Sequence, residues 1–123
     1  MKHTICWTDI PVTDLNRALA FYSALLAAPV SRETAEPGVD YGLLPWSEGA
    51  VSGCLVVARD NAPSPTGPMI YLSVEGRLDE AIRVAAQQGG RVLEPKHPIG
   101  PHGFRAVITD CEGNRLALHS TQP

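Results

Sequence analysis

Apolar and polar positions follow the same order twice along the chain. A β-branched and aromatic run at 5–10 precedes a helical apolar stripe at 15–26, and a similar run at 69–74 precedes a stripe at 78–88. Short apolar segments follow each stripe, separated by turns that contain Gly, Pro or acidic residues. An internal repeat of this kind predicts two matched structural units. We expect a ligand site where the two units meet.

Each half therefore predicts a strand, a helix and then further strands, which is typical of an α+β domain with helices on one face of the sheets. The expected later strands are 41–46, 51–57, 91–93, 104–109 and 115–119. We assign 1–60 to the first module, 61–68 to a linker and 69–121 to the second module of a single domain, 1–123. The Pro-rich segment 94–103 is expected to form an irregular loop, because Pro lacks the amide donor of regular structure.

Composition excludes several classes of protein. A net charge of -3 gives no electrostatic basis for binding nucleic acid. The sequence holds no apolar run long enough to span a bilayer, and its first residues lack the pattern of a secretory signal. The three cysteines, Cys6, Cys54 and Cys111, form no C-x-x-C pair, which favours a reducing compartment. We expect a cytoplasmic protein with neither membrane nor nucleic acid among its partners.

Four motifs in register connect the chain to a known group of proteins. They are Ile-Pro-Val-Thr-Asp-Leu-Asn-Arg-Ala at 10–18 followed by Phe-Tyr at 21–22, Ile-Tyr-Leu-Ser-Val-Glu at 70–75, Gly-Gly-Arg-Val at 89–92, and Asp-Cys-Glu-Gly-Asn-Arg-Leu-Ala-Leu at 110–118. In these motifs the chain resembles the vicinal oxygen chelate superfamily of glyoxalases, bleomycin-resistance proteins and extradiol dioxygenases. The resemblance implies two βαβββ modules whose antiparallel or mixed sheets curl into a half-open cup, with the helices on the outer face.

The resemblance also implies four positions for a divalent metal, two in each module. Here they hold Trp7, Cys54, Met69 and Ala117. Metal-dependent members place His and Glu at such positions. Trp and Ala cannot coordinate a metal, and a thioether and a lone thiol are poor ligands for hard cations. We therefore expect no metal and no other cofactor.

The same positions predict a binding pocket for a small, partly apolar molecule. Strand alternation places Trp7, Met69 and Tyr71 on the cup side, and His119 shares the parity of Ala117. We expect ligand contacts from the following residues: Trp7, Met69, Tyr71, Ala117 and His119, with Cys54 on the floor and Phe104 near the mouth. His119 could bind an acidic group or act as a base, and it could equally be a half-exposed terminal histidine. The apolar residues could also simply fill the cup as core.

Two further groups of residues could have a chemical role, but the sequence gives them less support than it gives the pocket. Glu94, His97 and His102 could form a separate metal site, although no helix fixes their spacing. Cys54 could be a nucleophile, but the sequence supplies no partner that would activate it. Hydrolase, phosphate-loop and dinucleotide motifs are absent from the sequence, so we assign no catalytic residue.

Three functions remain open. The first is a metal-free protein that binds a small molecule, as in the bleomycin-resistance branch. The second is an enzyme of the superfamily, a lyase, isomerase or dioxygenase, with a displaced metal site. The third is an interaction module whose cup is filled by its own side chains. The resemblance implies a homodimer, and a half-open cup leaves apolar strand surface for a partner to cover.

Overall fold

Eight strands form two separate four-stranded sheets in the computed structural model, which describes residues 3–123. The first sheet has the order β1-β4-β3-β2, from β1 (Trp7–Pro11), β2 (Ser31–Glu36), β3 (Val39–Leu43) and β4 (Ser52–Val56). The second has the order β5-β8-β7-β6, from β5 (Ile70–Ser73), β6 (Arg91–Pro98), β7 (Phe104–Thr109) and β8 (Arg115–Ser120). In each sheet the first strand pairs in parallel with the last, and the other pairs are antiparallel. The predicted α+β fold of two βαβββ modules is confirmed.

The two helices begin and end close to where the apolar stripes predict. Helix α1 (Leu15–Leu26) starts after Asp14, whose carboxylate accepts a hydrogen bond from the backbone amide of Arg17 at 3.0 Å. The helix closes at Ala27, which takes a left-handed conformation with φ of 52°. Helix α2 (Leu78–Gln87) carries two acidic residues in its first turn, where they favour the helix dipole.

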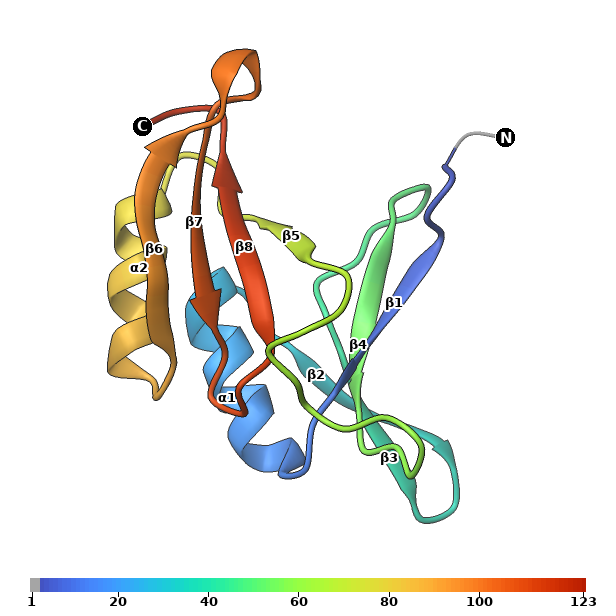
Figure 1. Cartoon of the computed structure of the whole chain (residues 1–123). Helices are drawn as coiled ribbons and strands as arrows, with labels where there is room; N and C mark the ends of the chain where they lie inside the picture. Colours follow the sequence, from blue (N-terminus) through green and yellow to red (C-terminus); the bar gives the residue numbers. More distant parts are fainter. Residues whose placement is uncertain (1–2) are drawn as a thin grey trace.

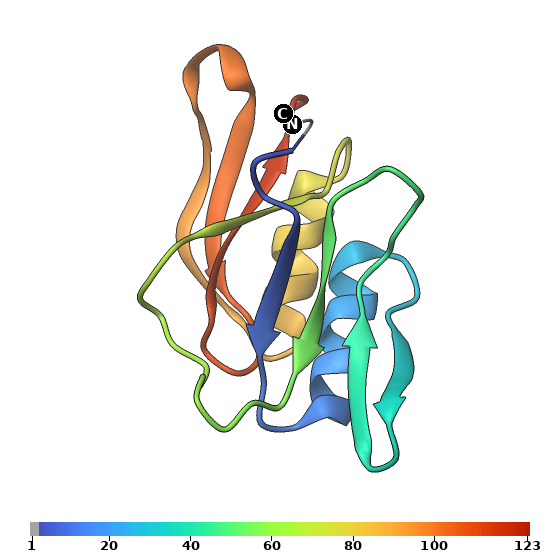
Figure 2. The same cartoon turned by 90° about the vertical axis from the view of Figure 1, so that its right-hand side faces the viewer.

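Both helices cover the same side of the fold, and the other side of each sheet is left open. Helix α1 packs on β3 and β4, helix α2 packs on β6, β7 and β8, and the two helices contact each other. The first sheet stands in front of the helices in Figure 2, whereas the second stands in front of them in Figure 1. The open faces of the two sheets are therefore turned in different directions.

The turn between β7 and β8 joins the two modules. The Asp110 carboxylate is 2% exposed and accepts hydrogen bonds from the Tyr22 hydroxyl at 2.6 Å and the Asn114 side chain at 3.0 Å. The Asn114 amide also donates to the carbonyl of Pro11 at 2.8 Å. In the same turn, Glu112 accepts from the amides of Thr13 at 2.7 Å and Asp14 at 2.8 Å. This motif of the second module thus binds the end of β1 and the start of α1.

Two segments depart from the sequence-based expectation. The Pro-rich loop predicted at 94–103 is wrong in part, because β6 continues through Pro98 before a short 3-10 helix, Gly100–His102. Strand β6 is an edge strand with two register shifts, and an edge strand tolerates Pro because one side needs no ladder hydrogen bonds. Strand β2 received no predicted bounds, since its six residues are all exposed and polar or small, without an apolar alternation.

Candidate ligand-binding site

The open face of the first sheet carries three side chains in contact, which we call the first half-site: Trp7, Asp9 and Cys54. Asp9 lies directly opposite Cys54 in the β1–β4 register. The indole Nε1 of Trp7 donates to Cys54 Sγ at 3.4 Å, and the thiol donates to Asp9 Oδ1 at 3.3 Å. Ile10, on the opposite parity, is buried in the core, so alternation turns Trp7 and Asp9 toward the open face.

The thiol of the first half-site is not activated. Burial, the largest cause, raises the pKa of Cys54; the carboxylate of Asp9 raises it further, and the bond from Trp7 opposes the shift. A thiol held in its protonated form is a poor nucleophile and a poor metal ligand. The surroundings of Cys54 therefore favour a structural role over a nucleophilic one.

The open face of the second sheet carries a different set, which we call the second half-site: Tyr71, Arg105 and His119. Arg105 lies opposite His119 in the β7–β8 register. Its guanidinium Nη1 donates to the Tyr71 hydroxyl, and its central carbon lies 5.9 Å from the centre of the Tyr71 ring. The rings of Tyr71 and His119 meet edge to face, with centroids 6.4 Å apart. His119 Nε2 lies 2.6 Å from the carbonyl oxygen of His102.

The residues at the four positions that the resemblance assigns to a metal do not fit a divalent cation. Trp7 and Ala117 offer no donor atom of the required kind, and the thiol of Cys54 is protonated. Between residues 3 and 123, no group of three or more His, Cys, Asp or Glu side chains is arranged to hold a metal. This includes the suggested set around His97, whose ring nitrogens lie against Arg105 Nε at 3.0 Å and the Pro95 carbonyl at 2.9 Å.

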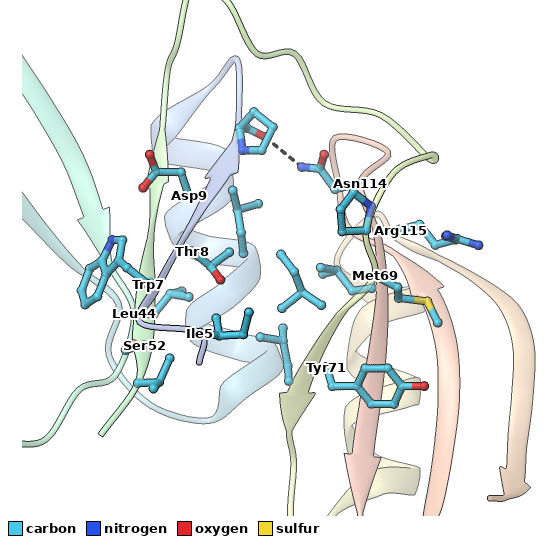
Figure 3. A pocket seen from close by; sticks show the side chains of 18 of the residues that line it. Ile5, Trp7, Thr8, Asp9, Leu44, Ser52, Met69, Tyr71, Asn114 and Arg115 are labelled. Atoms are coloured by element: carbon cyan, nitrogen blue, oxygen red, sulfur yellow. Dashed lines mark hydrogen bonds between the residues drawn. The ribbon is translucent and has the colours of Figure 1, made fainter. Parts of the chain in front are cut away.

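A cleft of about 960 Å³ separates the β1 and β5 edges, with the linker along its rim. Three of the predicted site residues, Trp7, Met69 and Tyr71, border it. Figure 3 shows, however, that Trp7 and Asp9 extend to one side of β1, whereas Tyr71 extends to the opposite side beyond β5. The two half-sites flank the cleft, and they do not face each other within one chain.

The remaining predicted residues fall in distinct places. Ala117 is fully buried opposite Tyr71 in the β5–β8 register. Phe104, expected near the mouth, instead packs against the hydrophobic core. Alternation along β7 consequently gives the open face to Arg105.

Two residues of the half-sites were missed by the sequence-based reasoning. Asp9 has the same strand parity as Trp7, and that parity was a sufficient signal to include it. Arg105 could have been found from Ala106 and Ile108, whose spacing marks the core-facing parity of β7. The aromatic ring of Phe104 outweighed this pattern.

In the described part of the chain, no helix has both the length and the apolar character needed to cross a membrane.

The chain matches one protein-family model and several known proteins. The family model described as the Glyoxalase/Bleomycin resistance protein/Dioxygenase superfamily matches residues 3–118. The candidate glyoxylase CFP32 of Mycobacterium bovis and that of Mycobacterium tuberculosis are each 26% identical over 120 residues, which is 98% of this chain and 45% of theirs. The chain thus spans about half the length of these curated relatives.

Solved structures show the same fold. A glyoxalase/bleomycin resistance protein from Albidiferax ferrireducens T118 superposes with a TM-score of 0.78 at 16% identity, covering 96% of this chain and 98% of that one. The fosfomycin resistance protein FosX from Listeria monocytogenes superposes with a TM-score of 0.67 at 16% identity, covering 98% and 94%. At these identities the likeness concerns the fold alone.

Proposed function

Because the chain belongs to the Glyoxalase/Bleomycin resistance protein/Dioxygenase superfamily, we propose that it uses this fold to bind a small, partly apolar molecule without a divalent metal. The observation that carries the proposal is the set of side chains at the four metal positions: Trp7, Cys54, Met69 and Ala117. Two of them, Trp7 and Met69, border the cleft and suit an apolar or aromatic ligand, because pockets for small molecules are lined largely by such groups.

The first test is whether the protein binds a divalent metal. A cation that binds only the native state stabilises it by ~2.7 kcal/mol at about one hundred times its dissociation constant. We expect no change in melting temperature with nickel, zinc, iron or manganese after treatment with a chelator. A clear rise that is lost in Glu94→Ala or His97→Ala would instead support an enzyme with a displaced metal site, a reading that the candidate glyoxylase CFP32 keeps open.

The second test is whether a small molecule binds next to Trp7. The chain contains two tryptophans, so the Trp46→Phe variant leaves Trp7 as the single indole reporter. A panel of small aromatic and acyl compounds is titrated while indole emission is followed. We expect a bound compound to perturb Trp7, since an aromatic contact contributes ~0.5–1.5 kcal/mol beyond buried area. Val57→Ala, at an exposed apolar residue outside the half-sites, is the control. Equal affinity in a folded Trp7→Ala variant would refute the assignment of the site.

We also propose that the functional unit is a homodimer. Each sheet has two edge strands, β1 and β2 in the first and β5 and β6 in the second, and such edges favour pairing with another chain. Trp7 is 41% exposed and Tyr71 is 48% exposed. A second copy would bring the first half-site of one chain opposite the second half-site of the other. Light scattering at micromolar concentration should give twice the 13.2 kDa mass of one chain, and a monomer would contradict this proposal.

A further inference from the structure

We propose that the second half-site is an anion-binding subsite, in which Arg105 holds a carboxylate, phosphate or phosphonate group of the ligand. This inference rests on the small-molecule binding proposed above and adds the chemical class of the ligand. It is carried by the contacts of the Arg105 guanidinium, which differ from those of the other paired basic residues.

Four of the other basic side chains in the described part of the chain pair with carboxylates, whereas Arg59, Arg83 and Arg91 are exposed to solvent and Arg115 donates to the Gly67 carbonyl at 3.3 Å. Arg32 pairs with Asp40 at 2.9 Å, and Lys96 pairs with Asp79 at 3.0 Å. Arg17 and Arg77 likewise have acidic partners. Arg105 takes part in none of the ion pairs found between residues 3 and 123, and its partners are an imidazole and a phenol. Its positive charge is therefore fixed in place and left uncompensated.

The imidazole that holds Arg105 is neutral. Arg105 Nε donates to His97 Nε2 at 3.0 Å, so this nitrogen supplies a lone pair. The other ring nitrogen, Nδ1, lies 2.9 Å from the carbonyl oxygen of Pro95, which can only accept a hydrogen bond. Nδ1 must then carry the proton. His97 thus orients the guanidinium without adding charge and without neutralising it.

The remaining donors of Arg105 suit an oxyanion. A guanidinium has five N–H groups, and His97 and Tyr71 occupy one on Nε and one on Nη1. One N–H group on Nη1 and both on Nη2 remain, and a guanidinium with donors on both terminal nitrogens can bind carboxylate or phosphate in a bidentate manner. The Tyr71 oxygen accepts from Arg105 and keeps its own hydroxyl hydrogen to donate.

Space and the imidazole of His119 lie beside these donors. A pocket of about 490 Å³ is lined by Tyr71, Ile99, His102 and His119. His119 Nε2 donates to the His102 carbonyl, and this bond orients the ring beside the pocket. The nearby carboxylate of Glu75 is occupied by the amide and hydroxyl of Thr121.

A panel of matched aromatic probes tests the inference: benzoate, phenylphosphonate and the neutral benzamide. Binding is followed by amide chemical shifts in NMR spectra of the Trp46→Phe protein, with Trp7 emission as a second signal. We expect the two anions to bind more tightly than benzamide. Arg105→Met should weaken the binding of both anions by about tenfold or more, because hydrogen bonds between a charged donor and an anion are lost. Benzamide should be unaffected.

Two variants serve as controls. Arg83→Met removes an exposed guanidinium from α2, outside the half-site, and should change anion affinity less than about twofold. Arg105→Lys keeps the charge and loses the donors on two terminal nitrogens, so it should bind the anions with intermediate affinity. If Arg105→Met fails to fold, the Lys variant and Tyr71→Phe carry the test.

The outcomes separate the two proposals. Equal binding of benzamide and the anions, or anion binding that survives in folded Arg105 variants, overturns the anion subsite and leaves the apolar site standing. Anion binding that depends on Arg105 without any response of Trp7 supports the subsite and counts against the proposed apolar site. Failure of both anions to bind at millimolar concentration overturns the inference.

Discussion

The two half-sites occupy equivalent places in the repeat and carry opposite chemistry. Asp9 lies opposite Cys54 in the first sheet, as Tyr71 lies opposite Ala117 in the second. The first half-site presents an indole, a protonated thiol and a carboxylate, whereas the second presents a phenol, a guanidinium and an imidazole. The repeated backbone fixes where these side chains point, and the side chains alone make one face acidic and the other basic.

The turns that follow β3 and β7 also differ between the two modules, in burial and in hydrogen bonding. Each contains a Glu-Gly pair, at 48–49 in the first module and 112–113 in the second. Glu48 is exposed to solvent, whereas the Glu112 side chain is 2% exposed and receives three hydrogen bonds from Thr13 and Asp14. The first turn only reverses the direction of the chain, whereas the second also forms hydrogen bonds with the first module. Substitutions in the two turns test this division.

The largest effect is expected from Asp110→Ala. The substitution removes a buried carboxylate, so the Tyr22 hydroxyl and the Asn114 side-chain amide lose their hydrogen-bond acceptor. The free energy of unfolding should fall by about 3 kcal/mol or more. Urea denaturation measures the loss. Ser47→Ala, in the exposed turn of the first module, should stay within about 0.5 kcal/mol of the parent. Similar losses in both variants would show that the two turns are equivalent.

A smaller loss, about 2 kcal/mol, is expected from Glu112→Gln at neutral pH, because the charged acceptor at the start of α1 becomes neutral. Burial acts to raise the pKa of Glu112, but the bonds from Thr13, Asp14 and Arg17 outweigh it, and the pKa is lowered. The carboxylate therefore stabilises the fold above its unfolded pKa of ~4.3, and this stabilisation is lost as pH falls through the lowered folded value.

Denaturation curves at several pH values measure this effect, with Glu48→Gln as the matched control. The difference between the parent and Glu112→Gln should shrink as pH falls below about 4. Glu48→Gln should show neither a loss nor this pH dependence, because its side chain is exposed. A difference that stays constant down to pH ~2 would contradict the proposed role of the charge.

The sequence predicted the helices and the buried strands well because their periodicity reflects burial. Strand β7 was placed at its observed bounds, Phe104–Thr109, and α1 at Leu15–Leu26. Strand β2 has no buried residue, so its pairing with β3 left no pattern to detect. For the candidate site, alternation places Trp7 and Tyr71 on the open faces of their sheets, but it could not reveal that these faces diverge. That arrangement depends on contacts between α1 and α2, which lie far apart in sequence.

The thiols provide a direct test of the first half-site. Burial, as the largest cause, raises the pKa of Cys54, and burial also raises that of Cys111 to about 11. Cys6 is exposed. At pH 8 an aromatic disulfide reagent should therefore modify Cys6 first and the other two at least about tenfold more slowly, because the thiolate is the reactive form. Mass spectrometry of partly modified protein identifies the sites, and fast modification of Cys54 would show that its environment is open.

The smallest effect on stability is expected from Trp7→Phe, which removes the indole N–H that donates to Cys54 Sγ at 3.4 Å. Sulfur is a weak acceptor and Trp7 is partly exposed, so the loss should stay below ~1 kcal/mol. The same bond lowers the pKa of Cys54 against the larger effect of burial. Its removal should therefore make Cys54 react still more slowly at fixed pH, provided that the smaller ring leaves access to the thiol unchanged.

Trp46→Phe, outside the half-site, is the control and should alter neither the stability nor the reaction rate of Cys54. Faster modification of Cys54 in Trp7→Phe would instead mean that the indole protects the thiol by covering it, and the first half-site would then be a packed surface rather than a hydrogen-bonded one.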